Sequence, residues 1–315
     1  MTGAGAAGGS PEHRHRAQGL PGASEHRHRD HVTLRPHCSR STATQYRGHP
    51  IAIRLLKAFY VKHEVVTGGI WQRSHYLDRM TLKELWVAFF RYPAIIAYLA
   101  LSAASIGVWF ARPAGALATA AAAAAVVLAY PLVWYAIHRW VLHSKWMFKV
   151  PALASTWKRI HYDHHQDPNH LEVLFGALHT TLPTIAIVTL PLGYAIGGVG
   201  GAAAAFAAGL ITTCVYEFVH CIQHLAYKPK WKFIAEMKKR HMAHHFHDER
   251  GNYGITNYFW DRRLGTFYDR PERPEKSPTV FNLGYTPEVA KRYPWVARLS
   301  GGVATGHPRK RRDAA

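Results

Sequence analysis

The sequence predicts an all-α integral membrane protein, with four transmembrane helices in two hairpins and a helical cap on the cytoplasmic side. Of its 315 residues, 48% are hydrophobic and only 18% are charged, a low share for a soluble globular protein. Residues 92–111, 113–138 and 173–216 contain no Asp, Glu, Lys or Arg. A transmembrane helix needs about 20 apolar residues, so these stretches can cross a bilayer. This composition excludes a disordered chain and argues against an ordinary cytosolic enzyme.

The N-terminal region divides into two parts. Residues 1–45 are rich in Gly, Ser, Ala, Arg and His, and they repeat Glu-His-Arg-His-Arg at 12–16 and 25–29. They lack the apolar stretch of a secretory signal, and we interpret them as a disordered tail, with a metal-binding His tract as the alternative. Residues 46–92 mix apolar and basic positions, which indicates amphipathic helices lying on the membrane surface. The capping-box spacing of Thr81 and Glu84 predicts a helix that leads into the first span.

Four spans are predicted from the uncharged stretches. Pro93–Ala111 forms the first span and Gly115–Ile137 the second, with a turn at Arg112 and Pro113. Residues 173–216 are too long for one crossing. The sequences Pro191-Leu192-Gly193 and Gly197-Gly198 interrupt them, and this predicts a hairpin of two spans. A buried helical pair in a large soluble core is the alternative, which the lengths disfavour.

The distribution of basic residues predicts the topology. The net charge is +20, yet only Arg112 lies between residues 92 and 138, and residues 164–227 contain no Lys or Arg. The basic residues therefore flank the apolar spans, as the positive-inside rule and contact with anionic headgroups require, and we expect no nucleic-acid partner. With an even number of spans, both termini and residues 138–172 lie on the cytoplasmic side. Residues 271–315 are Pro-rich and then basic, which is typical of a loosely held tail.

Histidines are the chemically informative residues, since there are 23 of them. Ten candidate metal ligands form four groups just after the second and fourth spans: His138 and His143; His161, His164 and His165; His220 and His224; His241, His244 and His245. Positions i, i+3 and i+4 of a helix share one face, so each HxxHH motif directs three imidazoles to one side. Residues five apart diverge by ~140° in a regular helix. The pair His138 and His143 therefore needs a helix end or a π-bulge to converge.

Ten imidazoles exceed what one ion can use, so two ions are predicted. Imidazole suits Fe, Zn, Cu and Ni alike, and the spacing does not name the metal. The three cysteines, Cys38, Cys214 and Cys221, are too scattered to indicate a disulfide framework or a thiolate site.

The helical positions also predict which histidines share an ion. Residues i and i+4 can chelate one ion, while the i+3 neighbour points to the side. We therefore expect His164 and His244 to cross over, each completing the site built mainly by the other hairpin. The predicted first ligand set is His138, His143, His161, His165 and His244. The predicted second set is His220, His224, His241, His245 and His164.

These four groups resemble the histidine boxes of the fatty acid hydroxylase/sterol desaturase superfamily of membrane di-iron enzymes. The resemblance extends to residues 251–266, where a Gly/Asn-rich turn precedes Trp260-Asp261 and Gly265-Thr266, and it covers roughly residues 80–270. Two features depart from the pattern. Glu217 follows Tyr216 where several relatives carry an Asp, and residues 165–170 differ from the aspartate-rich turn of the eukaryotic acyl 2-hydroxylases.

The resemblance implies a membrane and catalytic hydroxylase domain over residues 93–270, with the ten histidines as its catalytic site. Its implied activity is O₂-dependent hydroxylation of a C–H bond in a membrane lipid, above all a fatty acyl chain. Two Fe ions are the implied cofactor, with Zn as a substitute and O₂ as co-substrate. The sequence contains no haem-binding His-Pro-Gly-Gly segment and no flavin fingerprint. An external ferredoxin- or cytochrome-type electron donor is therefore implied.

Two alternatives remain open at this point. Within the same enzyme class, the substrate could be a sterol- or carotenoid-type ring lipid, hydroxylated or desaturated. From another class, the protein could be a His-rich membrane metal carrier. A carrier should place ionisable ligands near the middle of the membrane, whereas only His179 lies within a predicted span. We further expect Asp163, Glu217, Asp248 and Asp261 either to accept hydrogen bonds from ligand imidazoles or to serve as helix caps and salt-bridge partners.

Overall fold

We describe residues 75–303 and 305–313 of a computed structural model of the chain. The predicted tail over residues 1–45, and residues 46–74 of the predicted interfacial segment, lie outside the described residues. In the described part, regular structure is helical, and Tyr76 and His170 form an isolated β-bridge. The all-α prediction is confirmed for this part of the chain.

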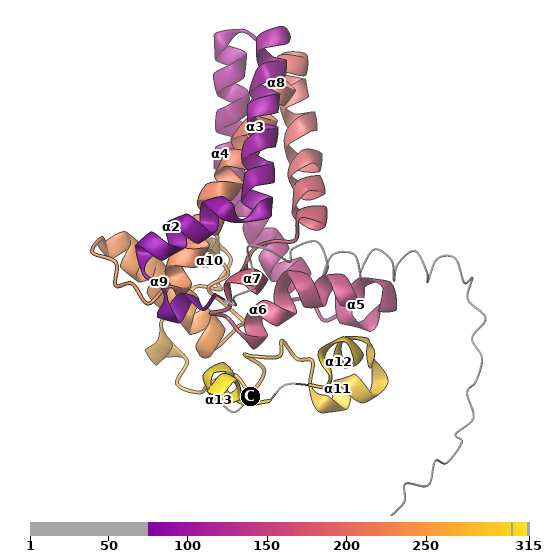
Figure 1. Cartoon of the computed structure of the whole chain (residues 1–315), viewed down its shortest axis with the longest axis vertical. Helices are drawn as coiled ribbons and strands as arrows, with labels where there is room; N and C mark the ends of the chain where they lie inside the picture. The colour runs from indigo at the N-terminus through magenta and orange to yellow at the C-terminus, as the bar shows by residue number, and fades with distance from the viewer. Residues whose placement is uncertain (1–74, 304, 314–315) are drawn as a thin grey trace, which may run out of the picture. The chain divides into compact units, whose positions relative to one another are not determined.

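Three apolar helices build a tall bundle: α3 (Pro93–Ala111), α4 (Ala116–Ile137) and α8 (Leu178–His224) (Figure 1). Each is long and apolar enough to cross a membrane. Large apolar side chains on the bundle face outward, and Phe110, Leu117, Leu128 and Ile187 are each more than 70% exposed. Such a surface is costly in water, at about 25 cal/mol per Å², and stable in hydrocarbon. This part of the chain is accordingly integral to a membrane.

Helix α8 reverses direction within the bundle. Gly197 (φ −150°, ψ 29°) and Gly198 (φ 59°, ψ −145°) are non-helical, and Figure 1 shows the two arms of α8 running side by side. A Cβ atom on Gly193 would lie 2.5 Å from the Cβ of Ala205, twelve positions later in the chain. The missing side chain therefore lets the two arms approach closely. The predicted break at Pro191-Leu192-Gly193 is wrong, because these residues stay helical and the glycine serves packing.

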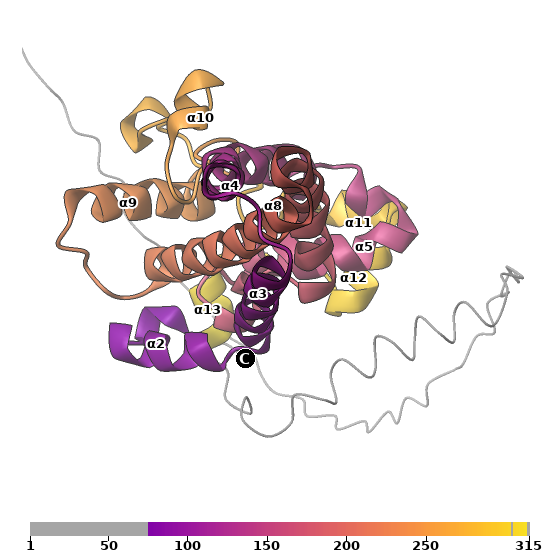
Figure 2. The same ribbon diagram turned by 90° about the horizontal axis from the view of Figure 1, so that it is seen from above.

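The bundle is closed by contacts of α8 with both α3 and α4 (Figure 2). Two of its buried residues, Tyr130 and Thr213, join α4 to the second arm of α8 through a hydrogen bond of 3.1 Å between their hydroxyls. An apolar cluster at the base, which includes Leu85, Ile95 and Leu210, joins α2 (Leu82–Arg91) to α3 and α8. These contacts fix where the histidine-bearing ends of α4 and α8 emerge.

Helix α2 starts at the predicted capping box. The Thr81 hydroxyl accepts a hydrogen bond from the Glu84 backbone N–H, and the Glu84 carboxylate accepts one from the Thr81 backbone N–H at 2.7 Å. Its residues Trp86 and Phe90 are nearly half exposed, and the position of this helix at a membrane surface stays a prediction.

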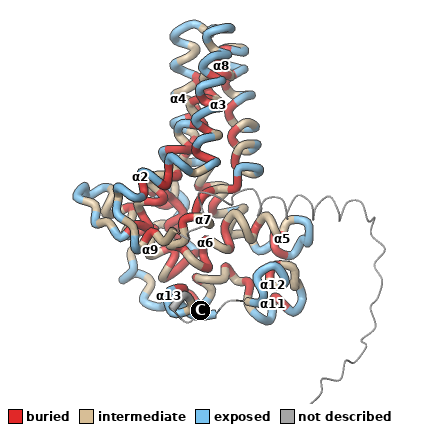
Figure 3. Tube along the Cα trace, in the orientation of Figure 1, coloured by how far each residue is buried: buried red, intermediate tan, exposed pale blue. Residues whose placement is uncertain are grey.

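A cap of short helices lies at the base of the bundle. After α4 it contains the π-helix η2 (His138–Leu142), the 3₁₀-helix η3 (Met147–Lys149), α5 (Pro151–Trp157), the π-helix η4 (Lys158–Tyr162), α6 (Asp163–Gln166) and α7 (Leu171–Leu174). After α8 it contains α9 (Lys232–Phe246), α10 (Phe259–Arg263), η5 (Arg270–Glu272), α11 (Pro287–Arg292), α12 (Trp295–Ser300) and α13 (Pro308–Asp313). The 3₁₀-helix η1 (Leu77–Arg79) precedes α2. Buried residues concentrate where the cap meets the bundle (Figure 3).

The segment after residue 270 packs into this cap. Tyr285 and Val296 are fully buried in a cluster with Phe148 and Trp157. The Tyr285 hydroxyl also accepts a hydrogen bond from the Ala297 backbone N–H at 3.0 Å. The expectation of a loosely held tail is therefore wrong for this segment. The prediction was based on the proline content and the charge of this segment, and it did not take account of the few apolar residues that pack against the cap.

Candidate metal centre

The first histidine pair converges through a π-helix. The backbone N–H of His143 donates to the His138 carbonyl at 3.1 Å, an i→i−5 hydrogen bond within η2. This wider turn places residues five apart on the same side, and the two ring centroids are 4.9 Å apart. The sequence-based requirement for a π-bulge or a helix end is confirmed.

His161, the first residue of the first HxxHH motif, lies in a second π-helix, η4, which was not predicted. The ring centroids of His161 and His165 are 4.7 Å apart, whereas those of His161 and His164 are 6.1 Å apart. On the regular helix α9 the order is the same, with His241 nearer to His245 (4.5 Å) than to His244 (5.9 Å). In both motifs the i+3 histidine therefore turns away from the i, i+4 pair.

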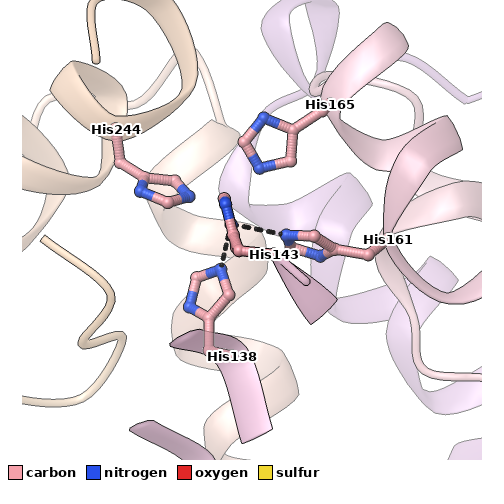
Figure 4. A group of neighbouring side chains, drawn as sticks. All are labelled: His138, His143, His161, His165 and His244. Carbon is pink, nitrogen blue, oxygen red and sulfur yellow. Dashed lines mark hydrogen bonds between the residues drawn. The ribbon is translucent and has the colours of Figure 1, made fainter. Parts of the chain in front are cut away.

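The ten histidines form two groups of five. In each group the ligand nitrogens all lie within 4.8 Å of one another. The first group is His138, His143, His161, His165 and His244, and Figure 4 shows these rings pointing toward one another (Figure 4). The second group is His164, His220, His224, His241 and His245. The structure thus brings together the same residues as the two predicted ligand sets, including the crossing of His164 and His244, while metal binding by them stays a prediction.

Backbone carbonyls fix the orientation of three rings in the first group. The Nδ1 atoms of His138, His165 and His244 lie 2.6, 2.9 and 2.7 Å from carbonyl oxygens. The carbonyls belong to Tyr253, Val280 and Gly251, respectively. A carbonyl can only accept a hydrogen bond, so each Nδ1 carries the proton and each Nε2 presents its lone pair to the group. This is the arrangement by which proteins orient imidazole ligands of metals.

The carboxylates considered as partners of the imidazoles have other roles. Asp261 accepts hydrogen bonds from the backbone N–H groups of Tyr253 and Gly254, both at 2.8 Å, and from the Thr266 hydroxyl at 2.8 Å. It thereby shapes the loop whose carbonyls hold His138 and His244. Burial raises the pKa of the Asp261 carboxyl, and the three donors oppose that shift.

The other acidic residues form local pairs. Asp248 pairs with Arg250 and Arg273, each at 2.8 Å. Asp163 pairs with Lys158, also at 2.8 Å. The carboxylate of Glu217 accepts a hydrogen bond from the Gly176 backbone N–H at 3.1 Å. The alternative of caps and salt bridges was therefore the better one for Asp163 and Asp248.

Burial keeps the imidazoles neutral. It lowers the pKa of His165 to about 3, and together with the neighbouring rings it holds the pKa of His244 well below its usual range. The pKa values of His161, His164, His241 and His245 are lowered in the same way. Neutral imidazole is the form that binds a metal ion.

The residues present fit bound metal ions. The buried Nε2 atoms of His165, His244 and His245 have no hydrogen-bond partner within the described residues, and such a deficit costs about 1–3 kcal/mol per group. Neighbouring Nε2 atoms approach to 3.2 Å between His138 and His143 and to 2.9 Å between His143 and His161. Two imidazoles on one ion, with metal–nitrogen bonds of about 2.0–2.1 Å, have nitrogens separated by ~3 Å at a right angle. A metal ion accounts for both observations.

Both groups border one cavity of about 340 Å³. Its walls are mainly apolar and come chiefly from α4, η2, η3, α5, η4 and α8. The apolar lining residues include Trp134, Ile137, Val141, Leu142, Met147 and Ile160. Tyr216, Glu217 and Thr181 add polar groups. Sequence reasoning missed this lining, because apolar residues near a span carry no signal that distinguishes a cavity wall from a lipid-facing surface.

Three further histidines near the motifs, His170, His179 and His247, lie outside both groups. His179 is exposed and belongs to neither group. His170 pairs with Glu172 at 2.8 Å, and the His247 ring forms a hydrogen bond with the Arg273 carbonyl.

The fold and the site define a helical membrane protein with a paired histidine centre at the base of its bundle. Residues 123–266 match the family model described as fatty acid hydroxylase. This part of the chain belongs to the fatty acid hydroxylase superfamily, as the histidine boxes indicated.

Curated relatives match over the same region. The ceramide very long chain fatty acid hydroxylase of Saccharomyces cerevisiae is 28% identical over 155 residues, 47% of this chain and 38% of the relative. The dihydroceramide fatty acyl 2-hydroxylase of Arabidopsis thaliana is 31% identical over 141 residues, 42% of this chain and 54% of the relative. The fatty acid 2-hydroxylase of Homo sapiens is 27% identical over 150 residues, 46% of this chain and 38% of the relative. The matches thus span from about two fifths to about half of these relatives' length.

A solved structure shares the fold. Full-length scs7p, of which only the hydroxylase domain is visible, superposes with a TM-score of 0.51 at 24% sequence identity. The match covers 60% of this chain and 69% of that chain.

Proposed function

We propose that this protein hydroxylates a C–H bond of a membrane lipid, with a fatty acyl chain as the substrate and O₂ as the co-substrate. The observation that carries this proposal is the pair of five-histidine groups that border a single apolar cavity at the base of a membrane bundle. The similar proteins described above are named as hydroxylases of fatty acids, fatty acyl groups or ceramide, which favours an acyl chain over a ring lipid.

In this proposal each histidine group holds one iron ion. When bound, the two irons supply the redox chemistry that activates O₂, and the net reaction inserts one oxygen atom into a C–H bond while the other becomes water. Two electrons and two protons are consumed, so an external ferredoxin- or cytochrome-type donor is part of the proposal. Zinc can occupy the same imidazole ligands but has no redox chemistry, so a zinc form should be inactive.

The chain's own residues prepare the site. The carbonyls of Gly251, Tyr253 and Val280 hold the Nδ1 protons of three ligands, so that these rings need no reorientation when metal binds. Apolar walls exclude water from the reacting centre, which protects it from side reactions. A smaller pocket lies between α4 and α8, and Trp134 and Thr184 line both this pocket and the main cavity. We infer that the acyl chain lies between α4 and α8, in this pocket, and reaches the histidines from the membrane side.

We further propose four membrane crossings: α3, α4 and the two arms of α8. This proposal is supported by the chain reversal at Gly197 and Gly198 and by the absence of Lys and Arg from residues 164–227. The cap and both termini then lie on the cytoplasmic side by the positive-inside rule. Residues 93–270 would form the membrane and hydroxylase domain, and the segment from 271 onward would complete the cap.

Lipid mass spectrometry of a host that expresses the protein tests the proposed activity. We expect lipids 16 Da heavier in acyl-containing fragments, and none from the His143→Ala variant. His179→Ala is the matched control, because it removes an exposed imidazole outside both groups, and it should retain the product. A product 2 Da lighter would indicate desaturation, and a heavier sterol or carotenoid would favour the ring-lipid alternative. Accumulation of metal without any new lipid would favour a metal carrier.

A further inference from the structure

The residue that follows each HxxHH motif contacts the C-terminal part of the chain. Gln166 follows His165 on α6, and Phe246 follows His245 on α9. The side-chain amide of Gln166 donates to the Phe281 carbonyl. The Phe246 ring lies 6.0 Å from the Phe281 ring and 5.7 Å from the His307 ring, between centroids. Residues 277–303 and 305–311, here called the C-terminal arm, therefore contact the end of both motifs.

Helix α6 is the last turn of a continuous helical stretch that starts with α5 and runs through η4, and Tyr162 before it is itself helical (φ −59°, ψ −47°). The last turn of a helix frays unless other contacts hold it. Two consecutive residues of α6 bind two consecutive carbonyls of the arm: His165 through Nδ1 to Val280 at 2.9 Å, and Gln166 through Nε2 to Phe281. These two hydrogen bonds hold the last turn against the arm, and the one to Val280 also sets the direction of the His165 ring.

Arg311 on α13 fixes the other end of the Gln166 side chain. Its Nη1 donates to Gln166 Oε1 at 2.8 Å, and its Nη2 donates to the Gln166 backbone carbonyl. A planar guanidinium can make such a pair of hydrogen bonds at once, which a lysine ammonium cannot reproduce. The Gln166 amide is thus held at its oxygen by Arg311 and at its nitrogen by Phe281.

The arm is itself anchored beside α9. At its start, the Ser277 backbone N–H donates to the His247 carbonyl at 2.8 Å, and the Thr279 hydroxyl donates to the Glu249 carboxylate at 2.5 Å. Near its end, Arg309 lies 3.6 Å from the Asp78 carboxylate. The arm therefore connects the segment after the second HxxHH motif to α6, which carries the end of the first motif.

We propose that the C-terminal arm is a positioning element of the first histidine group, and that Arg311 acts as a positioning residue through Gln166 on His165. The inference rests on the proposed function, because it requires the first group to hold a metal ion. The family match ends at residue 266, so the arm contributes to the site from outside the matched region. Three carbonyls orient imidazoles in the first group, and the one from Val280 is the one that belongs to the C-terminal arm.

Metal retention by the purified full chain tests this proposal. Wild type, Arg311→Ala, Arg311→Lys and Lys310→Ala are loaded with metal and dialysed against increasing concentrations of a chelator. The ions that remain are counted by elemental analysis. Lys310→Ala is the matched control, since it removes one positive charge from an exposed position on the same helix.

We expect Arg311→Ala to lose the first of its two ions at about tenfold lower chelator concentration, the size of effect seen when outer partners of metal ligands are removed. Its second ion should stay as in wild type. Arg311→Lys should fall in between, and Lys310→Ala should match wild type. In the metal-free protein, amide hydrogen exchange over residues 158–170 should be faster in Arg311→Ala than in Lys310→Ala.

Equal metal loss and equal exchange in Arg311→Ala and Lys310→Ala would overturn the inference. Simultaneous loss of both ions with a lowered unfolding temperature would also overturn it, because the arm would then support the fold in general. A wild-type protein that retains no ion would defeat the proposed function as well. Failure of the inference alone is recognised by a wild type that retains two ions.

Discussion

The Nδ1 atom of His138 lies 2.6 Å from the carbonyl oxygen of Tyr253, although the two residues are 115 positions apart in the chain. This contact ties the end of α4 to the loop between α9 and α10. Because a carbonyl only accepts, it also determines which His138 nitrogen faces the first histidine group. The loop that carries Tyr253 is held by Asp261, so a residue that touches no imidazole influences the site.

The crossing of the i+3 histidines predicts which ion each substitution weakens. His164→Ala should release the second-group ion first, and His244→Ala the first-group ion, because each removes one of five ligands. Elemental analysis during chelator dialysis compares two double variants. His164→Ala/His220→Ala changes the second group alone and should retain one ion, like His164→Ala. His164→Ala/His143→Ala changes both groups and should retain none. Retention of one ion by both double variants would contradict the assignment.

The π-helix η2 predicts an asymmetry between deletion and insertion. Deleting the exposed Trp140 leaves His138 and His143 four positions apart, and in a regular helix such a pair still shares one face. Inserting an Ala after Trp140 separates them by six positions and turns His143 about 120° away from His138. We expect the deletion variant to bind two ions and the insertion variant to bind one, as measured by elemental analysis. A deletion variant that loses an ion while its helical content is unchanged would refute this account of η2.

Removal of the Asp261 carboxylate should destabilise the cap and the first group together. Asp261 is fully buried and accepts three hydrogen bonds. Asp261→Ala leaves these donors unsatisfied, which should cost about 3 kcal/mol or more. Asp261→Asn should cost less, since its oxygen still accepts. Denaturant unfolding measures the effect, with the partly exposed Asp269 as the control in Asp269→Ala. Similar losses in Asp261→Ala and Asp269→Ala would count against the role of Asp261.

The reversal of α8 depends on small residues where its arms meet. A Cβ atom on Gly201 would lie 2.3 Å from the Gly193 carbonyl oxygen, whereas a Cβ atom on Gly107 of α3 meets nothing within 4 Å. Gly201→Ala should therefore reduce the yield of folded protein in detergent, and Gly107→Ala should not. Thermal unfolding followed by size-exclusion chromatography compares the two. Equal unfolding temperatures of Gly201→Ala and Gly107→Ala would show that the arms can move apart without loss of stability.

The proposed four crossings predict that both termini lie in the cytoplasm. Tags at the two ends should be inaccessible to an impermeant reagent in sealed cells and should become labelled after permeabilisation. Val199 lies at the reversal between the two arms of α8, and a Val199→Cys variant should react with the impermeant reagent from outside the cell. External labelling of the C-terminal tag would refute the topology.

Features set by neighbouring residues could be predicted from the sequence. The uncharged stretch 92–111 contains all of α3, the Thr81–Glu84 capping box starts α2, and the HxxHH spacing determines which imidazoles share a face. Each of these depends on contacts within a few turns of one helix, so the local sequence contains the information. The need for a helix end or a π-bulge between His138 and His143 also followed from spacing alone.

Other features were decided by tertiary structure. Nothing in the spacing marks η4 as a π-helix, and nothing near His165 indicates that Val280 holds its Nδ1 proton. The packing of Tyr285 against the cap likewise joins segments far apart in the chain. Backbone carbonyls are present at every residue, so no residue type signals which of them will orient a ligand. That choice depends on where the folded chain brings distant segments together, and only the assembled structure contains it.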